Sequence, residues 1–278
     1  MRKKAQQDYD VIIVGSGAAG GMCAYVLACS GVKVLMLEAG RDYDPVTETP
    51  MFQMPKDAPM RGAGTPEKPF GFYDATVDGG WEVPGEPYSS AEGTDFQWWR
   101  ARMLGGRTNH WGRYSLRFSH HDFKAHSRDE FGADWPIEYA DLADWYDKTE
   151  TLVGVCGDSP GLDDMPDSSA GVLHPPPAGR VYERLISAAC KKLDIPTAHM
   201  RRAILTRPME DEADPRQPCY WATPCGRGCS IGAAFQTPTS VIPMAGDRSL
   251  ACSDGRYGES EGSGPSCSRN KLAWAVVC

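Results

Sequence analysis

The clearest hydrophobic pattern of the chain lies in its first forty residues. A continuous apolar, β-branched run at 11–14 predicts a strand of a parallel sheet that is buried on both faces. The segment after it repeats apolar residues at helical spacing, which predicts a helix with one apolar face. That face consists of Ala19, Met22, Cys23, Val26 and Leu27. Gly31 predicts the end of the helix, and a second strand is expected over 32–37. Strand, helix and strand in this order predict an α/β fold that begins with a βαβ unit.

The turn between the first strand and the helix has the pattern G-x-G-x-x-G. It reads Gly15-Ser16-Gly17-Ala18-Ala19-Gly20. The first glycine allows a tight turn, the second lets the backbone approach a pyrophosphate, and the third permits close helix packing, while the helix N-terminus offers N–H groups to phosphates. Glu38 ends the second strand, where an acid accepts hydrogen bonds from an adenosine ribose and disfavours NADP. This context predicts a dinucleotide site rather than a purely structural turn, without separating FAD from NAD.

Composition narrows the class of protein. The 278 residues are 41% hydrophobic and 24% charged, enough for one large domain or two small ones. A net charge of -8 without clustered Lys and Arg argues against a nucleic-acid partner. No stretch approaches the roughly 20 apolar residues of a membrane span, and we expect no signal peptide. The ten cysteines are spread along the chain, which favours a reducing compartment and a cytoplasmic location.

A second glycine turn follows a long Pro- and Gly-rich excursion at about 41–95. The excursion lacks periodicity, so it is expected to be either a lid over a cofactor or a poorly ordered insertion. The turn reads Leu104-Gly105-Gly106-Arg107-Thr108-Asn109-His110-Trp111. Paired glycines before small and polar residues indicate a backbone that passes close to something flat or charged. Here the sequence resembles the glucose-methanol-choline (GMC) oxidoreductase family, whose Leu-Gly-Gly turn is followed by Asn or His beside the flavin ring.

With the first glycine turn and the Glu38-Ala39-Gly40 strand end, the resemblance spans about residues 8–245. It implies an FAD-binding Rossmann-type domain followed by an incomplete substrate domain. The implied cofactor-binding residues are Gly15, Ser16, Gly17, Ala18, Ala19, Gly20, Glu38, Ala39, Gly105, Gly106, Thr108, Asn109 and His110. The implied reaction is hydride transfer from a CH–OH group of a sugar, glycoside or polyol to flavin N5, and we expect this chain to be a truncated, incomplete enzyme that is inactive alone. The electron acceptor implied is oxygen, a quinone or a cytochrome, and a small subunit is a further candidate partner.

The His110-Trp111 pair is similar to the branch that contains pyranose oxidase and the bacterial flavin-dependent sugar dehydrogenases. In pyranose oxidase the matching histidine is bonded covalently to the flavin, so the resemblance implies that His110 lies beside the ring. The alternative for a single His next to a Trp is a hydrogen-bonded packing histidine.

Two helices are expected in the middle of the chain. The first follows Trp135 and has a solvated acidic side. Its apolar face consists of Leu142, Trp145, Tyr146 and Thr149. The second lies at 181–193, after a Pro-rich segment at 157–179 that is expected to be a mobile loop.

A cysteine trio, Cys219, Cys225 and Cys229, has the spacing C-x5-C-x3-C. Thiolates at short separations can hold an iron–sulfur cluster, and some sugar dehydrogenases of the resembled family carry a three-iron cluster here. A structural zinc site would want four ligands. Because this chain lacks the adjacent cysteine pair of the cluster-bearing members, we expect the trio to be fortuitous, with a cluster as the alternative.

The resemblance ends after Ala245. Residues 246–270 are dominated by Ser, Gly, Arg and Asp, and we expect neither a strand nor a helix there. We therefore divide the chain into an FAD-binding domain at 1–120, a partial substrate region at 121–245 and a non-native or frameshifted tail at 246–278. A catalytic base is left unassigned. The rival functions are a non-enzymatic truncated FAD-binding fragment and another Rossmann flavoprotein, such as a monooxygenase, for which a second G-x-G-x-x-G would be expected.

Overall fold

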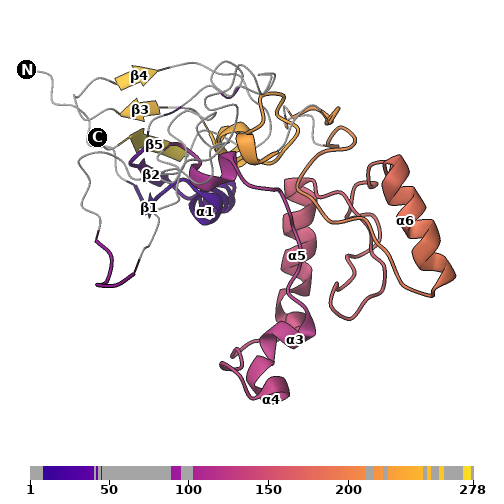
Figure 1. Ribbon diagram of the computed structural model, residues 1–278. Helices are drawn as coiled ribbons and strands as arrows, with labels where there is room; N and C mark the ends of the chain where they lie inside the picture. The colour runs from indigo at the N-terminus through magenta and orange to yellow at the C-terminus, as the bar shows by residue number, and fades with distance from the viewer. Residues whose placement is uncertain are drawn as a thin grey trace, which may run out of the picture. The chain divides into compact units, whose positions relative to one another are not determined.

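The computed structural model describes residues 9–40, 42, 45, 89–94, 103–210, 214, 216–221 and 225–246, together with the backbone of three strands closer to the C-terminus. Most of the predicted 41–95 excursion lies outside these residues. The chain divides into two compact units (Figure 1). The first comprises Met1–Gly112, Glu210–Arg216 and Trp221–Cys278, and the second comprises Arg113–Met209 and Gln217–Tyr220. These units are defined by packing alone, so the functional division at residues 120 and 245 stays a prediction.

The first unit is built on a sheet that confirms the predicted βαβ start and the α/β fold class. Strand β1 (Val11–Val14) pairs in parallel with β2 (Val34–Glu38), and α1 (Ala18–Cys29) connects them. The sheet order is β1-β2-β5-β3-β4, where β5 spans Leu272–Val276, β3 spans Ser249–Ala251 and β4 spans Tyr257–Glu259. All neighbours are parallel except β3 and β4.

The expectation that residues 246–270 contain no strand is wrong, because β3 and β4 lie there as an antiparallel pair. Their pairing is made by backbone N–H and C=O groups, which every residue of these strands supplies whatever its side chain. Short strands therefore form without the apolar alternation that the sequence lacks. Whether the tail is native is a separate question, and its assignment as a non-native segment stays a prediction.

Helix α1 ends as the sequence predicts. Gly31 has a left-handed φ of +89° and donates its N–H to the Ala28 carbonyl at 3.0 Å. The N–H of Val32 reaches back to the Leu27 carbonyl at 3.0 Å. These two bonds form a Schellman motif, in which a residue without a Cβ turns the chain and satisfies the last helical carbonyls.

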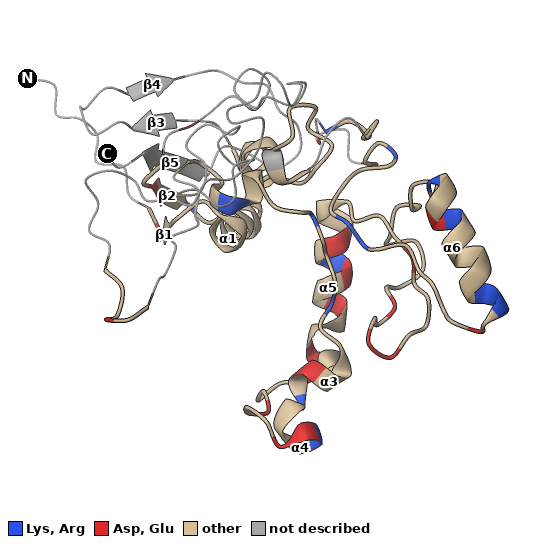
Figure 2. Ribbon diagram, in the orientation of Figure 1, with Lys and Arg blue, Asp and Glu red and all other residues tan. Residues whose placement is uncertain are grey.

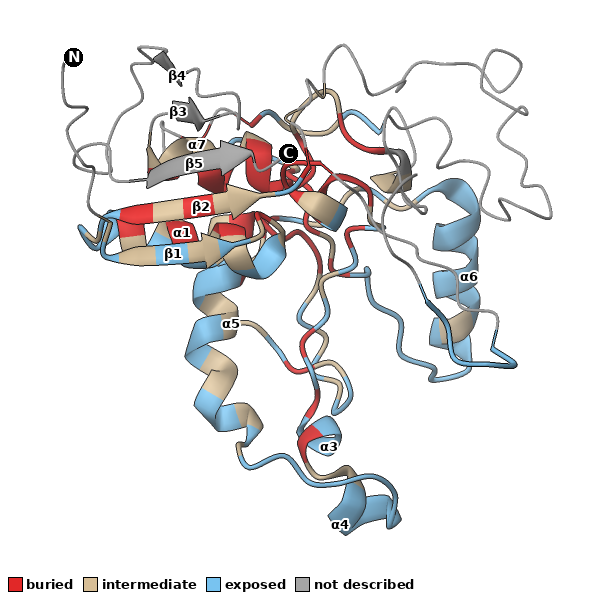
Figure 3. Cartoon of the chain, turned by 90° about the vertical axis from the view of Figure 1, so that its left-hand side faces the viewer, coloured by how far each residue is buried: buried red, intermediate tan, exposed pale blue. Residues whose placement is uncertain are grey.

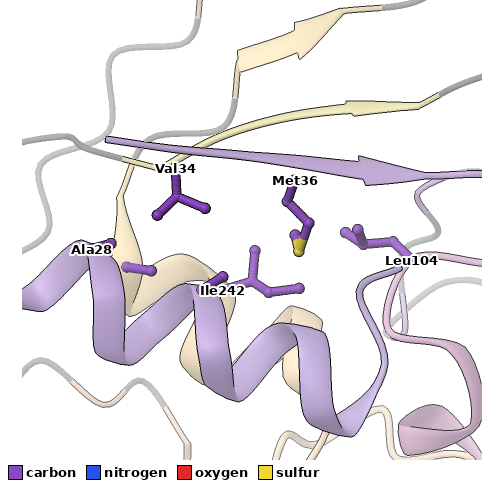
Figure 4. Packing of buried hydrophobic residues seen from close by; sticks show 7 residues of the cluster. Ala28, Val34, Met36, Leu104 and Ile242 are labelled. Carbon is purple, nitrogen blue, oxygen red and sulfur yellow. The ribbon is translucent and has the colours of Figure 1, made fainter. Parts of the chain in front are cut away.

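The buried face of α1 differs from the predicted one. Gly21, Ala24 and Ala28 are buried, whereas Val26 is 51% exposed. Small residues on the inner face let the helix lie close to β2 and to α7 (Val241–Ala245). The resulting core is formed by Ala24, Ala28, Val34, Met36, Leu104, Ile242 and Ala245 (Figure 4).

We expected β1 to be buried on both faces, but it is not. It forms one edge of the described sheet, and Ile12 and Val14 are 61% and 82% exposed (Figure 3). An apolar run by itself does not distinguish a central strand from an edge strand, because position in the sheet is decided by segments distant in sequence.

The second unit confirms both predicted helices. Helix α5 spans Tyr139–Val153 and α6 spans Val181–Lys192, preceded by the short helices α3 (His120–Phe123) and α4 (Ala125–Asp129). On α5, Leu142 and Tyr146 are half-buried, whereas Trp145 and Thr149 are exposed, so its predicted apolar face is only half right. In the part of the chain that the structure describes, no helix combines the length and apolarity needed to cross a membrane.

Figure 2 shows acidic residues along α5, and we expected this side of the helix to be solvated. Two of the acids instead bind a buried arginine. Asp147 and Glu150 both bind the buried guanidinium of Arg117, whose Nε lies 3.0 Å from Oε1 of Glu150. Arg117 also donates to the Tyr139 hydroxyl at 2.9 Å. Burial by itself would lower the pKa of Arg117, but these hydrogen bonds raise it well above its usual value. A buried arginine needs such partners, which explains why acids of α5 turn inward.

Candidate cofactor site

The first glycine turn has the geometry that a dinucleotide site requires. Gly15 has a left-handed φ of +90° and donates its N–H to the Leu37 carbonyl at 2.7 Å, which ties the turn to β2. A Cβ on Gly20 would lie 1.9 Å from the Gly15 carbonyl oxygen, so only glycine lets α1 pack this close. A Cβ on Gly17 would meet no described atom within 4 Å. The same holds for Gly15, which is favoured as glycine by its left-handed φ, whereas Gly20 is required by close packing.

The open side of the turn lies at the N-terminus of α1. Gly17 is the N-cap of this 12-residue helix and has no side chain that could cap the first turn. The N–H groups that begin the helix, next to the exposed Ala18 and Ala19, carry the positive end of the helix dipole. This combination fits the pyrophosphate of a dinucleotide.

Glu38 is held at the mouth of the same turn. Its Oε2 accepts the Ser16 N–H at 2.9 Å and also the Ser16 hydroxyl, and its Oε1 accepts the Gly40 N–H at 2.8 Å. Ala39 lies exposed beside it. A carboxylate has about four lone-pair sites, so Glu38 keeps acceptor capacity for a ribose hydroxyl while its position is fixed.

The second glycine turn packs against the first. Gly105 and Gly106 have left-handed φ values of +86° and +50° and lead into the 3-10 helix η3 (Gly106–Asn109). A Cβ on Gly106 would lie 3.8 Å from Cα of Gly17, and a Cβ on Gly105 would lie 2.5 Å from Cδ of Pro238. The paired glycines thus allow this turn to fit between the first turn and the segment at 236–240.

Asn109 ends η3 and His110 follows it, and both are buried. The Asn109 amide donates to the carbonyls of Leu104 at 2.8 Å and Gly106 at 3.0 Å, so it holds the turn in shape. The His110 backbone N–H donates to the Arg107 carbonyl at 3.2 Å. The structure brings these residues into one unit with the first turn, and their contact with a flavin stays a prediction.

Sequence reasoning missed Thr237, which lies in the 3-10 helix η5 (Thr237–Thr239) and is fully buried. Its hydroxyl donates to the Ser16 carbonyl at 2.9 Å, and its N–H donates to the Thr108 hydroxyl oxygen at 3.1 Å. The Thr108 hydroxyl in turn donates to the Gly105 carbonyl at 2.6 Å. No local pattern in the sequence marks Thr237, because its partners lie 129 and 221 residues away.

The three cysteines of the trio are distributed over both units. Cys219 packs in the second unit, whereas Cys225 and Cys229 belong to the first. Cys229 is buried, and its sulfur accepts the Ala234 N–H at 3.4 Å. Among the described residues, no group of three His, Cys, Asp or Glu side chains is placed to hold a metal ion.

Comparison with known proteins bears on this geometry. Residues 8–47 match the family described as FAD binding domain. This match covers β1, α1 and β2, including Glu38. FAD is therefore the cofactor, as the resemblance implied, and the residues that bind it stay a prediction.

Similarity to individual proteins extends further along the chain. The chain is 27% identical to the fructose dehydrogenase large subunit of Gluconobacter japonicus over 241 residues, covering 84% of the chain and 42% of that protein. It is 31% identical to paromamine 6'-oxidase of Streptomyces fradiae over 201 residues, covering 70% of the chain and 32% of that protein. It is 29% identical to 2-methyl-1,2-propanediol dehydrogenase of Mycolicibacterium austroafricanum over 209 residues, covering 74% of the chain and 35% of that protein. The chain thus spans about a third to two fifths of the length of these relatives.

Proposed function

We propose that this chain carries the FAD-binding domain of a GMC-like oxidoreductase, and that this enzyme oxidises a CH–OH group of a sugar, glycoside or polyol. The observation that carries the proposal is the meeting of two glycine turns around the open space at Gly17, in a segment that matches FAD-binding domains. The substrate class is supported by the names of the relatives, which refer to fructose, paromamine and a propanediol.

In this proposal each part of the site has a separate task. The N-terminus of α1 and Gly17 bind the pyrophosphate, and Glu38 binds the adenosine ribose. The second turn, from Gly105 to His110, lies beside the flavin ring and orients it. The buried Asn109 amide keeps this turn in shape. Bound FAD would supply the hydride acceptor at N5, so the protein has to position the cofactor and substrate rather than provide redox groups of its own.

For these 278 residues on their own, the proposal is FAD binding without turnover. Oxidation of an alcohol needs a base that takes the hydroxyl proton, a contribution of about 10²–10⁴-fold in rate. None of the candidate residues named above is assigned this role. A cytochrome, quinone or oxygen as electron acceptor and a partner subunit remain proposals, as does the cytoplasmic location expected from the spread of the cysteines.

Two measurements test these proposals. Purified chain is incubated with FAD, separated from free cofactor and denatured, and the supernatant is expected to show a flavin absorption band. NAD is not expected to be retained, and the absence of flavin from both the supernatant and the precipitated protein would overturn the proposed site. Dye reduction with fructose, aldoses and glycosides then separates the rivals, since turnover by the loaded chain excludes binding without catalysis.

A covalent bond between His110 and the flavin, like that of the matching histidine in pyranose oxidase, has its own test. If the imidazole is bonded to the flavin, acid precipitation of loaded protein leaves flavin in the pellet, and His110→Ala releases it to the supernatant. Flavin that stays in the pellet with His110→Ala would exclude the bond. Flavin that is released from both proteins would leave His110 as a packing residue, consistent with its 1% exposure.

A further inference from the structure

Ser16 belongs to the first glycine turn, is fully buried and is bonded to the second turn. The Ser16 hydroxyl donates to Oε2 of Glu38, and Oγ of Ser16 accepts the N–H of Gly105 at 2.7 Å. We propose that Ser16 is a positioning residue that couples the carboxylate of Glu38 to the second glycine turn, so that both ends of the FAD site are set together. This inference rests on the proposed roles of Glu38 and the second turn in binding FAD.

The hydrogen bonds that join the Gly105 N–H, the Ser16 hydroxyl and the Glu38 carboxylate run in one direction. A backbone N–H can only donate, so Gly105 must be the donor to Ser16. The hydroxyl then uses its one proton toward the carboxylate, which is the stronger acceptor. Hydrogen bonds that run in series polarise one another. Removing the hydroxyl therefore affects both the charged end at Glu38 and the buried N–H at Gly105.

The rest of Ser16 is engaged in the same connection. Its backbone N–H donates to Glu38 at 2.9 Å, and its carbonyl accepts the hydroxyl of Thr237 at 2.9 Å. Thr237 is bonded through Thr108 to the Gly105 carbonyl. The Gly105 N–H and C=O are thus both linked to residue 16, by separate routes. The second turn cannot shift relative to Glu38 without breaking one of these bonds.

The coupling is tested by a double-mutant cycle on the FAD dissociation constant, measured by flavin fluorescence on the whole chain. Ser16→Ala is expected to weaken binding by about 10-fold or more, because a hydrogen bond to a charged group is lost. In a Glu38→Gln background the same change is expected to cost less than about 3-fold, because its partner is already altered. Equal losses in both backgrounds, or no loss in either, would overturn the proposal.

A matched control separates this effect from loss of a serine hydroxyl in general. Ser30 lies in the same unit, is exposed, and its hydroxyl donates only to the Val26 carbonyl at 2.8 Å among the hydrogen bonds described. Ser30→Ala is expected to leave FAD binding unchanged. A loss equal to that of Ser16→Ala would show that the effect is not specific to the link between the turns, and would overturn the proposal.

A second arm needs no cofactor and therefore separates failure of this inference from failure of the proposed function. Amide hydrogen exchange is followed in the peptide that contains Gly105. Ser16→Ala is expected to speed the exchange of the Gly105 amide at least several-fold, since its acceptor is removed. Glu38→Gln, which does not touch Gly105, is expected to speed it as well, and this variant still decides the matter if Ser16→Ala does not fold. Unchanged exchange in Glu38→Gln would overturn the coupling even if the chain binds FAD.

Discussion

The pair Gly20→Ala and Gly17→Ala separates the structural role of the glycine turn from its proposed binding role. Each change adds one methyl group to the same turn. At Gly20 the new Cβ would lie 1.9 Å from the Gly15 carbonyl oxygen and 3.0 Å from its carbon. Both are backbone atoms, so no side chain can rotate away, and the start of α1 has to move by about 1.5 Å to reach ordinary contact distance.

The expected magnitude follows from these contacts. Overpacking costs about 1–3 kcal/mol, and the upper end applies because backbone must move. Alanine recovers about 1 kcal/mol over glycine in a helix. The remaining loss of about 2 kcal/mol corresponds to a fall in Tm of about 4–8 °C for a chain of this size. Gly17 has φ of -62° and open space around it, so alanine meets no clash. Because alanine is a poorer N-cap than glycine, we expect a loss below about 1 kcal/mol and a fall in Tm below about 4 °C.

FAD affinity is expected to fall strongly in Gly17→Ala, the variant whose stability changes less. The methyl of Gly17→Ala occupies the space where a pyrophosphate would approach, so FAD should bind at least about 10-fold more weakly although the fold is intact. Thermal unfolding by circular dichroism and FAD titration measure the two effects on the same samples, with Gly179→Ala in the second unit as the matched control. A Gly20→Ala variant that melts with the parent, or a Gly17→Ala variant that binds FAD normally, would refute the reasoning.

Two further predictions concern the second unit. Burial opposes ionisation of Asp147, but hydrogen bonds from Ser169 and Arg117 outweigh it and lower the pKa of Asp147; its stabilisation is present above the unfolded pKa of about 3.9 and is lost as the pH falls through the lower folded value. The urea midpoint should therefore fall less between pH 5 and pH 3 in Asp147→Asn than in the parent, and equal slopes would contradict this. Burial raises the pKa of Cys156 to about 11, so at pH 8 iodoacetamide should modify the exposed Cys23 and leave Cys156 unlabelled by mass spectrometry, and equal labelling would show the opposite.

The parts of the fold that sequence predicts well are those whose causes are local. The limits of β1, the presence of α1 and its end at Gly31 all follow from a few neighbouring residues. The inner face of α1 does not, because Ala24 and Ala28 are buried by their closeness to β2 and α7, and a strip of larger apolar residues gives the stronger local signal. Pattern analysis ranks residues by hydrophobicity, whereas close packing here selects them by size.

The candidate site divides in the same way. The glycines and Glu38 were found because a dinucleotide imposes a fixed spacing on them. Thr237 was not found, because its role is to bond distant backbone groups and any small hydroxyl residue could serve. The acids of α5 were misjudged for a related reason. Glu150 is buried by Arg117, a partner 33 residues away that periodicity within the helix cannot register.

The long separation between Ser16 and Thr237 has a consequence for the order of events during synthesis. The hydrogen bond between them spans 221 residues, with the entire 113–209 segment translated in between. At about 5–20 residues per second, a ribosome needs roughly 10–45 s to pass from one to the other. During that interval the nascent glycine turn has its own backbone contacts but lacks the threonine that ties it to the second turn. The second unit is thus translated in full before the first can complete its FAD site.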